Sequence, residues 1–479
     1  MKRLLKCGVP LLACLLSACD FAPTYVAPPV ATPTDFKESA DWTLATPKDA
    51  APRGRWWQIF QDPALDRLED QVTAANQNLK VAIAQYDEAH ADARTAQADY
   101  YPTLDAGGLV SRQGLSREVA NPLPKRSLTS YSLGLDLDYE IDVWGRVRNQ
   151  AKAGVDREQA SAGDLATVDL SLHAELASDY FILRGDDAEQ DVLERTVENY
   201  RKALALTQAR FNIGYAARPD VSAARAQFES ATTQATEIRL KRATLEHAIA
   251  ILTGQPPAGF ALPENKLDAT PPDIAAVLPA ALLERRPDIA AAERRVAAAN
   301  ADIGVAKAAY YPAFNLNALL GVEAAMPNHL FTAPAQAWSL GPSAAVNLLD
   351  GGKRRALNEH ARASYDEAAA QYRQTVLDAY GEVEDSLASL RLLARESVSQ
   401  QAAVTAAADS TAQATHLYDG GLANYYNVIE AQNIELNARL TQLDIATRRM
   451  TADVSLIKAL GGGWQRKDGL GPATAAATD

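Results

Sequence analysis

The chain has 479 residues, which is enough for two or three ordinary domains. Its 60 acidic and 47 basic residues give a net charge of -13, which argues against a nucleic-acid partner because such proteins need a basic face. The six histidines are scattered along the chain, and the three cysteines all lie within the first 19 residues. This distribution argues against a zinc site and against a disulfide framework. We expect no metal and no cofactor.

Residues 1–18 predict a lipoprotein signal peptide. Three basic residues precede an apolar run, residues 9–16, which is too short to span a bilayer as a helix. Cys19 follows Leu-Ser-Ala at the expected cleavage point, a stretch that resembles the lipobox of bacterial lipoproteins, so we expect Cys19 to become the lipidated first residue of the mature chain. An ordinary signal peptide that happens to contain cysteines is the alternative.

Residues 19–61 are expected to form a lipidated N-terminal tether. Asp20 follows the lipidated cysteine, and in enteric bacteria an aspartate at this position resembles a signal for retention in the inner membrane. Other bacteria follow that rule loosely, so the membrane in which the protein lies has to be predicted from the rest of the sequence.

The remainder of the sequence is one plan written twice. Tyr100-Tyr101-Pro102 recurs at residues 310–312, and farther on Gly214 and Gly254 match Gly421 and Gly461. Each half predicts a helix, two strands, a very long helix and a return helix. The expected parts are a first repeat at 62–254, a connecting segment at 255–280, a second repeat at 281–461 and a flexible tail at 462–479.

Two intervals without proline indicate unusually long helices. No proline occurs between Pro124 and Pro219 or between Pro342 and Pro472, and proline interrupts helices. Apolar residues there recur at alternating steps of three and four, the period of a coiled coil. A helix from about residue 146 to residue 211 would be about 100 Å long.

Segments between the helices have a period of two. Apolar and polar residues alternate over 131–141, which predicts a strand with one apolar and one polar face. Similar runs at 104–110 and 314–322 predict two more strands, and 340–348, which contains Pro342, is the weakest of the four. Strands of this kind suit a membrane barrel, and a soluble sheet with one wet face is the alternative.

Four strands cannot close a membrane barrel, because the known small barrels have about eight. An open sheet edge is not tolerated in lipid. If the strands lie in a membrane, several chains must share one barrel, and three chains would supply twelve strands.

Five stretches, in order and at matching spacing, resemble a known family. They are Pro23, Tyr25 and Pro28 after the cysteine, Trp56–Leu65, Tyr139–Arg146, Arg285–Glu293 followed by Tyr311-Pro312, and Leu349–Arg354. The chain is similar to the TolC-like outer-membrane factors, and in particular to the NodT-type lipoproteins that serve multidrug and metal efflux pumps.

The resemblance implies an α+β membrane protein and a homotrimer. A 12-stranded β-barrel in the outer membrane would be continued by a long periplasmic α-helical coiled-coil barrel. Such trimers are passive exit ducts of tripartite pumps for drugs, metals or other small molecules and are not enzymes. The implied partners are a periplasmic adaptor, an inner-membrane transporter of the RND class and outer-membrane lipid.

The resemblance also implies functional residues at the turns after the long helices. Gly214, Gly420 and Gly421 would form tip turns that meet the adaptor, since glycine permits the left-handed backbone of such turns. Asn427, Glu430 and Asp220 match the positions of the periplasmic gate. Asn427 departs from the family, where aspartate is usual, so one carboxylate ring is absent.

Four carboxylates lie on the polar face of the best-defined strand. Asp136, Asp138, Glu140 and Asp142 would make a water-filled lumen acidic and favour cations. The alternative is that they solvate the periplasmic rim, because periodicity gives the face and not the depth.

Two stretches resemble enzyme motifs only in part. Residues 350–353 lack the first glycine of a phosphate loop, and Ser455 and Lys458 have S-x-x-K spacing without its companion motifs. Two alternatives to the efflux duct stay open: a duct for protein secretion, and a periplasmic coiled-coil lipoprotein that spans no membrane.

Overall fold

The computed structural model describes residues 20–39, 55–114, 116, 118, 127–265, 272 and 285–464. Cys19, the signal peptide and the tail beyond residue 464 lie outside the described residues. The chain divides into two compact units. Unit 1 comprises Met1–Pro29, Tyr86–Ser161 and Ala291–Arg373, and unit 2 comprises Val30–Gln85, Ala162–Ala290 and Gln374–Asp479.

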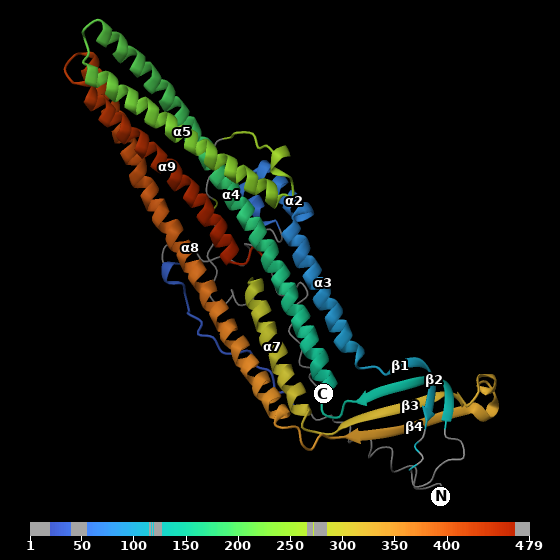
Figure 1. Ribbon diagram of the computed structural model, residues 1–479. Coiled ribbons are helices and arrows are strands. Elements are labelled where there is room, and N and C mark those ends of the chain that lie inside the picture. Colours follow the sequence, from blue (N-terminus) through green and yellow to red (C-terminus); the bar gives the residue numbers. More distant parts are fainter. Residues whose placement is uncertain are drawn as a thin grey trace. The chain divides into compact units, whose positions relative to one another are not determined.

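Most of the described chain is helical, and four strands complete it (Figure 1). None of its described helices is both long enough and apolar enough to cross a membrane. The elements, in chain order, are η1 (Lys37–Ser39), η2 (Trp56–Phe60), α2 (Pro63–Ala75), α3 (Gln77–Ala98), β1 (Thr103–Gly114), β2 (Ser127–Ile141), α4 (Arg146–Asn212), α5 (Arg218–Leu252), η3 (Pro257–Gly259), α7 (Pro287–Ala308), β3 (Ala313–Ala324), η4 (Pro327–His329), η5 (Ala333–Ala335), β4 (Gln336–Ala345), α8 (Lys353–Asp419) and α9 (Tyr425–Ala459).

The two halves have helices of equal length. Helices α4 and α8 each have 67 residues, α5 and α9 each have 35, and α3 and α7 each have 22. At about 1.5 Å per residue, each long helix runs for about 100 Å, as the absence of proline predicted. Helix α4 ends one residue beyond the predicted position.

The strands of unit 1 form one antiparallel sheet in the order β1-β2-β3-β4. The fourth strand differs from its prediction, because it begins at Gln336 and ends at Ala345 instead of covering 340–348. Pairing with β3 sets these limits. Strand β4 has β3 as its one neighbour in the sheet, which explains how a strand can hold Pro342.

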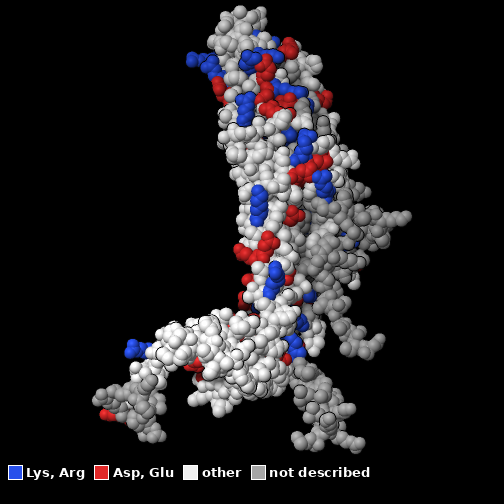
Figure 2. Space-filling view, turned by 90° about the vertical axis from the view of Figure 1, so that its right-hand side faces the viewer, with Lys and Arg blue, Asp and Glu red and all other residues white. Residues whose placement is uncertain are grey.

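Strand register gathers the apolar side chains on one face. Leu104 pairs with Leu137, Leu135 pairs with Leu320, and Leu320 pairs with Trp338. Directly paired residues point to the same side of a sheet. The apolar face therefore extends across all four strands. The part of the sheet region that faces the viewer in Figure 2 shows few charged side chains.

In unit 2, the predicted tryptophan motif packs against α4. Trp56, Trp57 and Phe60 are all buried, and the Phe60 ring lies 4.8 Å from the Phe181 ring. Asp62 begins α2 by accepting a hydrogen bond from the Ala64 amide. Its other carboxylate oxygen accepts a hydrogen bond from the Tyr180 hydroxyl at 2.6 Å, so the start of α2 is attached to α4.

A buried ion pair reinforces this attachment. The His173 Nδ1 atom of α4 lies 2.5 Å from the Glu69 Oε2 atom of α2, and the imidazole stacks on the Trp57 indole. Burial alone would lower the pKa of His173, but the carboxylates of Asp169 and Glu69 outweigh it and raise it to about 9. Burial raises the pKa of Glu69 to about 7, against the opposing effect of His173.

Both shifts predict that unit 2 loses stability as the pH rises. A raised pKa means that the folded state holds the proton more tightly than the unfolded chain does. The stabilisation is complete below the unfolded pKa values and is lost as the pH passes through about 7 and then about 9. We expect His173→Gln to lower the free energy of unfolding by roughly 3 kcal/mol at pH 8, where Glu69 and His173 are both charged, and by much less at pH 10, where His173 is neutral.

Thermal unfolding midpoints between pH 6 and pH 10 test this expectation. His90→Gln is the matched control, because His90 pairs with Glu158 but is half-exposed. The account requires a pH-dependent loss in His173→Gln and almost none in His90→Gln. Equal and pH-independent losses in the two variants would contradict it.

Candidate functional site

The polar face of the sheet carries acidic residues from three strands. Asp136 of β2 pairs with Asp105 of β1, and the Asp138 Oδ2 atom accepts a hydrogen bond from the Asn317 side chain at 2.6 Å. Glu323 of β3 accepts a hydrogen bond from the Ser130 hydroxyl. Sequence analysis missed Asp105 and Glu323, because only the strand register places Asp105 opposite Asp136 and Glu323 opposite Ser132 on the same face.

Glu140 and Asp142 have a different setting from Asp136 and Asp138. Glu140 binds the Arg146 guanidinium through both carboxylate oxygens, at 2.7 and 2.5 Å. Asp142, one residue beyond the end of β2, pairs with Arg148 at 3.1 Å. These pairs join the end of β2 to the first turn of α4, and their positive partners offset the charge that the two acids add to the polar face.

The tip turns differ in how they use glycine. Gly214, in the turn between α4 and α5, has a φ of 79°, and Gly421, between α8 and α9, has a φ of 72°. That left-handed backbone explains glycine at both positions. Gly420 has a negative φ, so the turn does not require glycine there.

The two hairpins are joined at their tips, where Figure 1 shows the turns close together. The Arg210 guanidinium of α4 lies 4.9 Å from the centre of the Tyr418 ring of α8 and 3.4 Å from the Asp419 carboxylate. Beneath them, Ala224, Tyr425 and Val428 form a buried cluster. The hairpin of α4 and α5 is therefore bound to the hairpin of α8 and α9 by charge, aromatic and apolar contacts.

The predicted gate residues lie at the starts of the return helices. The Asp220 carboxylate accepts a hydrogen bond from the Ala217 amide at 3.0 Å, so it caps α5. In α9 the cap is reversed, because Asn424 is the acceptor and the Asn427 amide is the donor. Asn427 and Glu430 are exposed, whereas the neighbouring Val428 is buried.

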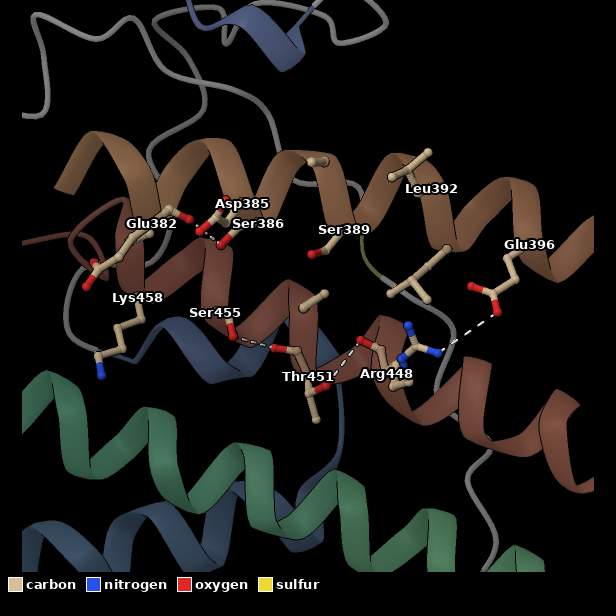
Figure 3. Close-up of a pocket in the computed structure, with 14 residues that line it drawn as sticks. Glu382, Asp385, Ser386, Ser389, Leu392, Glu396, Arg448, Thr451, Ser455 and Lys458 are labelled. Carbon is tan, nitrogen blue, oxygen red and sulfur yellow. Dashed lines mark hydrogen bonds and ion pairs between the residues drawn. The ribbon is translucent and has the colours of Figure 1, made fainter. Parts of the chain in front are cut away.

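A groove of about 870 Å³ lies between α8 and α9 in unit 2 (Figure 3). Glu396 of α8 pairs with Arg448 of α9 at 3.9 Å. The Ser455 hydroxyl, one half of the S-x-x-K pattern with Lys458, donates to the Thr451 carbonyl of its own helix at 2.9 Å. That bond is the ordinary one for a serine inside a helix.

Among the described residues, no group of His, Cys, Asp and Glu has the arrangement of a metal site.

Comparison with known proteins identifies the class. The family model described as outer membrane efflux protein matches residues 68–255 and 278–462. The antibiotic efflux pump outer membrane protein ArpC of Pseudomonas putida is 30% identical over 98% of this chain and 97% of its own length. The cation efflux system protein CusC of Escherichia coli is 28% identical over 95% of this chain and 98% of its own length.

Solved structures agree with this class. The outer-membrane channel OprN is 29% identical, with a TM-score of 0.86 over 93% of this chain and 100% of that one. The open state of the Neisseria gonorrhoeae MtrE channel is 26% identical, with a TM-score of 0.81 over 94% of this chain and 99% of that one.

The chain belongs to the outer membrane efflux protein family. It is the outer-membrane component of an efflux system, which confirms the predicted family, function and location. The predicted combination of long helices with four strands is confirmed as well.

The tip contacts predict a local effect of one arginine. Arg210→Ala removes both the contact with the Tyr418 ring and the pair with Asp419, which together contribute about 1–2 kcal/mol. We expect hydrogen exchange in both tips to become roughly 5- to 30-fold faster. Exchange mass spectrometry of the detergent-extracted protein measures it.

Arg201→Ala is the matched control for this experiment. Arg201 pairs with Glu198 of its own helix and does not join the hairpins. An equal effect of the two substitutions would show that Arg210 does not couple the tips.

Proposed function

We propose that three copies of this chain form a closed 12-stranded barrel in the outer membrane. The continuous apolar face of the sheet is the observation that supports this most strongly. Strands β1 and β4 are the edges of the sheet, so each has one free side in a single chain. Lipid requires both edges to be paired, and neighbouring copies can supply the missing strands.

We further propose that the helices continue this barrel as a tube. Equal helix lengths support two structural repeats, at 62–254 and 281–461, and three copies would contribute twelve helical passages. A tube of this kind conducts passively, and the energy for export comes from an inner-membrane transporter of the RND class. The periplasmic coiled-coil rod is disfavoured, because a rod would leave the apolar sheet face in water.

The helical tips are the proposed contact for the periplasmic adaptor. Gly214, Gly420 and Gly421 lie in turns that also carry strongly exposed apolar side chains. Ile213 is 70% exposed, Tyr215 is 84% exposed and Leu422 is 80% exposed. Apolar residues gathered on protruding turns are typical of a surface that a partner covers.

The cargo is proposed to be small molecules or metal ions. The relatives are named for antibiotic, toluene and cation efflux. Asp105, Asp136, Asp138 and Glu323 on the polar face would make the lumen acidic and favour cations. Glu140 and Asp142 contribute less in this proposal, because arginines pair with them. Protein secretion lacks a comparable supporting relative among these proteins.

Cys19 is the proposed site of lipidation, and it would attach the mature chain to outer-membrane lipid.

A second proposal concerns the gate, where Glu430 would form a ring of three carboxylates in the closed trimer. Asp220 acts there as a helix cap, and Asn427 adds no charge. Glu430 therefore has the dominant electrostatic role.

This gate assignment predicts the effect of Glu430→Gln. Removing three carboxylates from a narrow ring should weaken block by divalent cations by about threefold or more. Titration of Mg²⁺ against single-channel conductance in planar bilayers measures the block.

Glu435→Gln is the matched control, because it makes the same change of charge on α9. Glu435 already pairs with Arg439 at 2.7 Å. Unchanged block in Glu430→Gln, or an equal change in Glu435→Gln, would contradict the assigned gate.

A further inference from the structure

Asp20 presents a conflict between sequence and location. An aspartate after the lipidated cysteine predicts retention in the inner membrane, whereas the family is an outer-membrane one. The structure of unit 1 bears on this conflict, because residues 20–25 are bound to its helices. We call these six residues the tether start.

The Asp20 carboxylate is attached to the first turn of α4. Its Oδ1 atom accepts a hydrogen bond from the Asn149 side chain at 2.7 Å and another from the Ala22 amide at 2.9 Å. Asn149 is 1% exposed, and its amide nitrogen also donates to the Gly145 carbonyl. The donor is therefore held in place before Asp20 binds it.

Positive charge lies in the neighbourhood of Asp20. A Cβ atom on Gly145 would lie 3.4 Å from both the Asp20 Oδ1 atom and the Arg148 Nη2 atom, so both groups lie beside this glycine, while Arg148 itself pairs with Asp142. The N-terminus of α4 adds partial positive charge at the same place. One side of Asp20 is open to solvent, but the position of its carboxylate is fixed.

The rest of the tether start is bound along α7 and the neighbouring aromatic residues. The Phe21 ring stacks on Tyr311 at 4.4 Å and on Trp144 at 5.8 Å. Asn300 donates to the Pro23 carbonyl at 2.8 Å, and the Tyr25 hydroxyl donates to Glu293 at 2.9 Å. Helix α7 thus supplies partners at two positions that are seven residues apart.

Gly304 provides the space in which the tether start lies against α7. A Cβ atom at this position would lie 2.8 Å from the Ala22 side chain and 2.6 Å from the Asn149 amide nitrogen. Contacts that short do not occur between real side chains, so a larger residue would displace the tether start or Asn149.

We propose that unit 1 contains a binding site for the tether start and that binding there prevents Asp20 from acting as a retention signal. Sorting machinery that reads the second residue needs a carboxylate that is free to move together with the acylated amino-terminus. Folding fixes that carboxylate on Asn149 and beside Gly145. Outer-membrane sorting of this chain then depends on a folded unit 1. The inference rests on the proposed lipidation of Cys19.

The test uses the full chain in an enteric bacterium, where membranes are separated by density. Asn149→Ala removes the donor, and Gly304→Val displaces the tether start. With Asp20 present, we expect the inner-membrane share of both variants to rise by about tenfold, the population shift that loss of a charge-assisted hydrogen bond gives. Asp20→Ser added to either variant should restore outer-membrane sorting.

Three controls make every result decisive. An endogenous lipoprotein with aspartate at the same position reports that the host reads the signal. If both single variants sort like the wild type, or if Asp20→Ser fails to restore sorting, the proposal is wrong. Palmitate labelling of the wild type separates this from lipidation, because absence of label would overturn the assignment of Cys19 itself and would leave the proposed duct untouched.

Discussion

The unpaired edges of a four-stranded sheet are the constraint on which the rest of this protein depends. Backbone N–H and C=O groups cannot remain unpaired in hydrocarbon, and this sheet has an apolar face that extends from β1 to β4. The two requirements conflict in a single copy and are met together when copies share a barrel. The proposed trimer would meet both requirements at once.

The great length of the helices reflects a second requirement, which is the distance that the proposed tube has to span. A rod of 67 residues without proline or an internal break is costly to hold straight unless partners support it along its length. Here the partners are the return helices, whose small side chains allow close packing. Gly185 of α4 leaves room for Thr447 of α9, because a Cβ atom there would lie 2.2 Å from the threonine hydroxyl. The turns then gather the ends of four helices at one place, where a few polar contacts can join or release them.

Local patterns in the sequence predicted most of the fold. Proline spacing and the alternating three-and-four pattern predicted α4 to within one residue, and period-two alternation predicted β2. The predicted limits of β4 were wrong, because the limits of this strand come from its pairing with β3 and its own sequence contains Pro342. The pairing of Asp105 with Asp136 needed the strand register. The pair of His173 and Glu69 joins residues 104 positions apart, and no local pattern could have indicated it.

The native mass of the detergent-extracted mature protein, after subtraction of bound detergent, tests the shared barrel most directly. The account predicts a mass of three chains that persists across mild detergents. A stable monomer under the same conditions would contradict it, because four strands would then have to satisfy their edges without neighbouring copies.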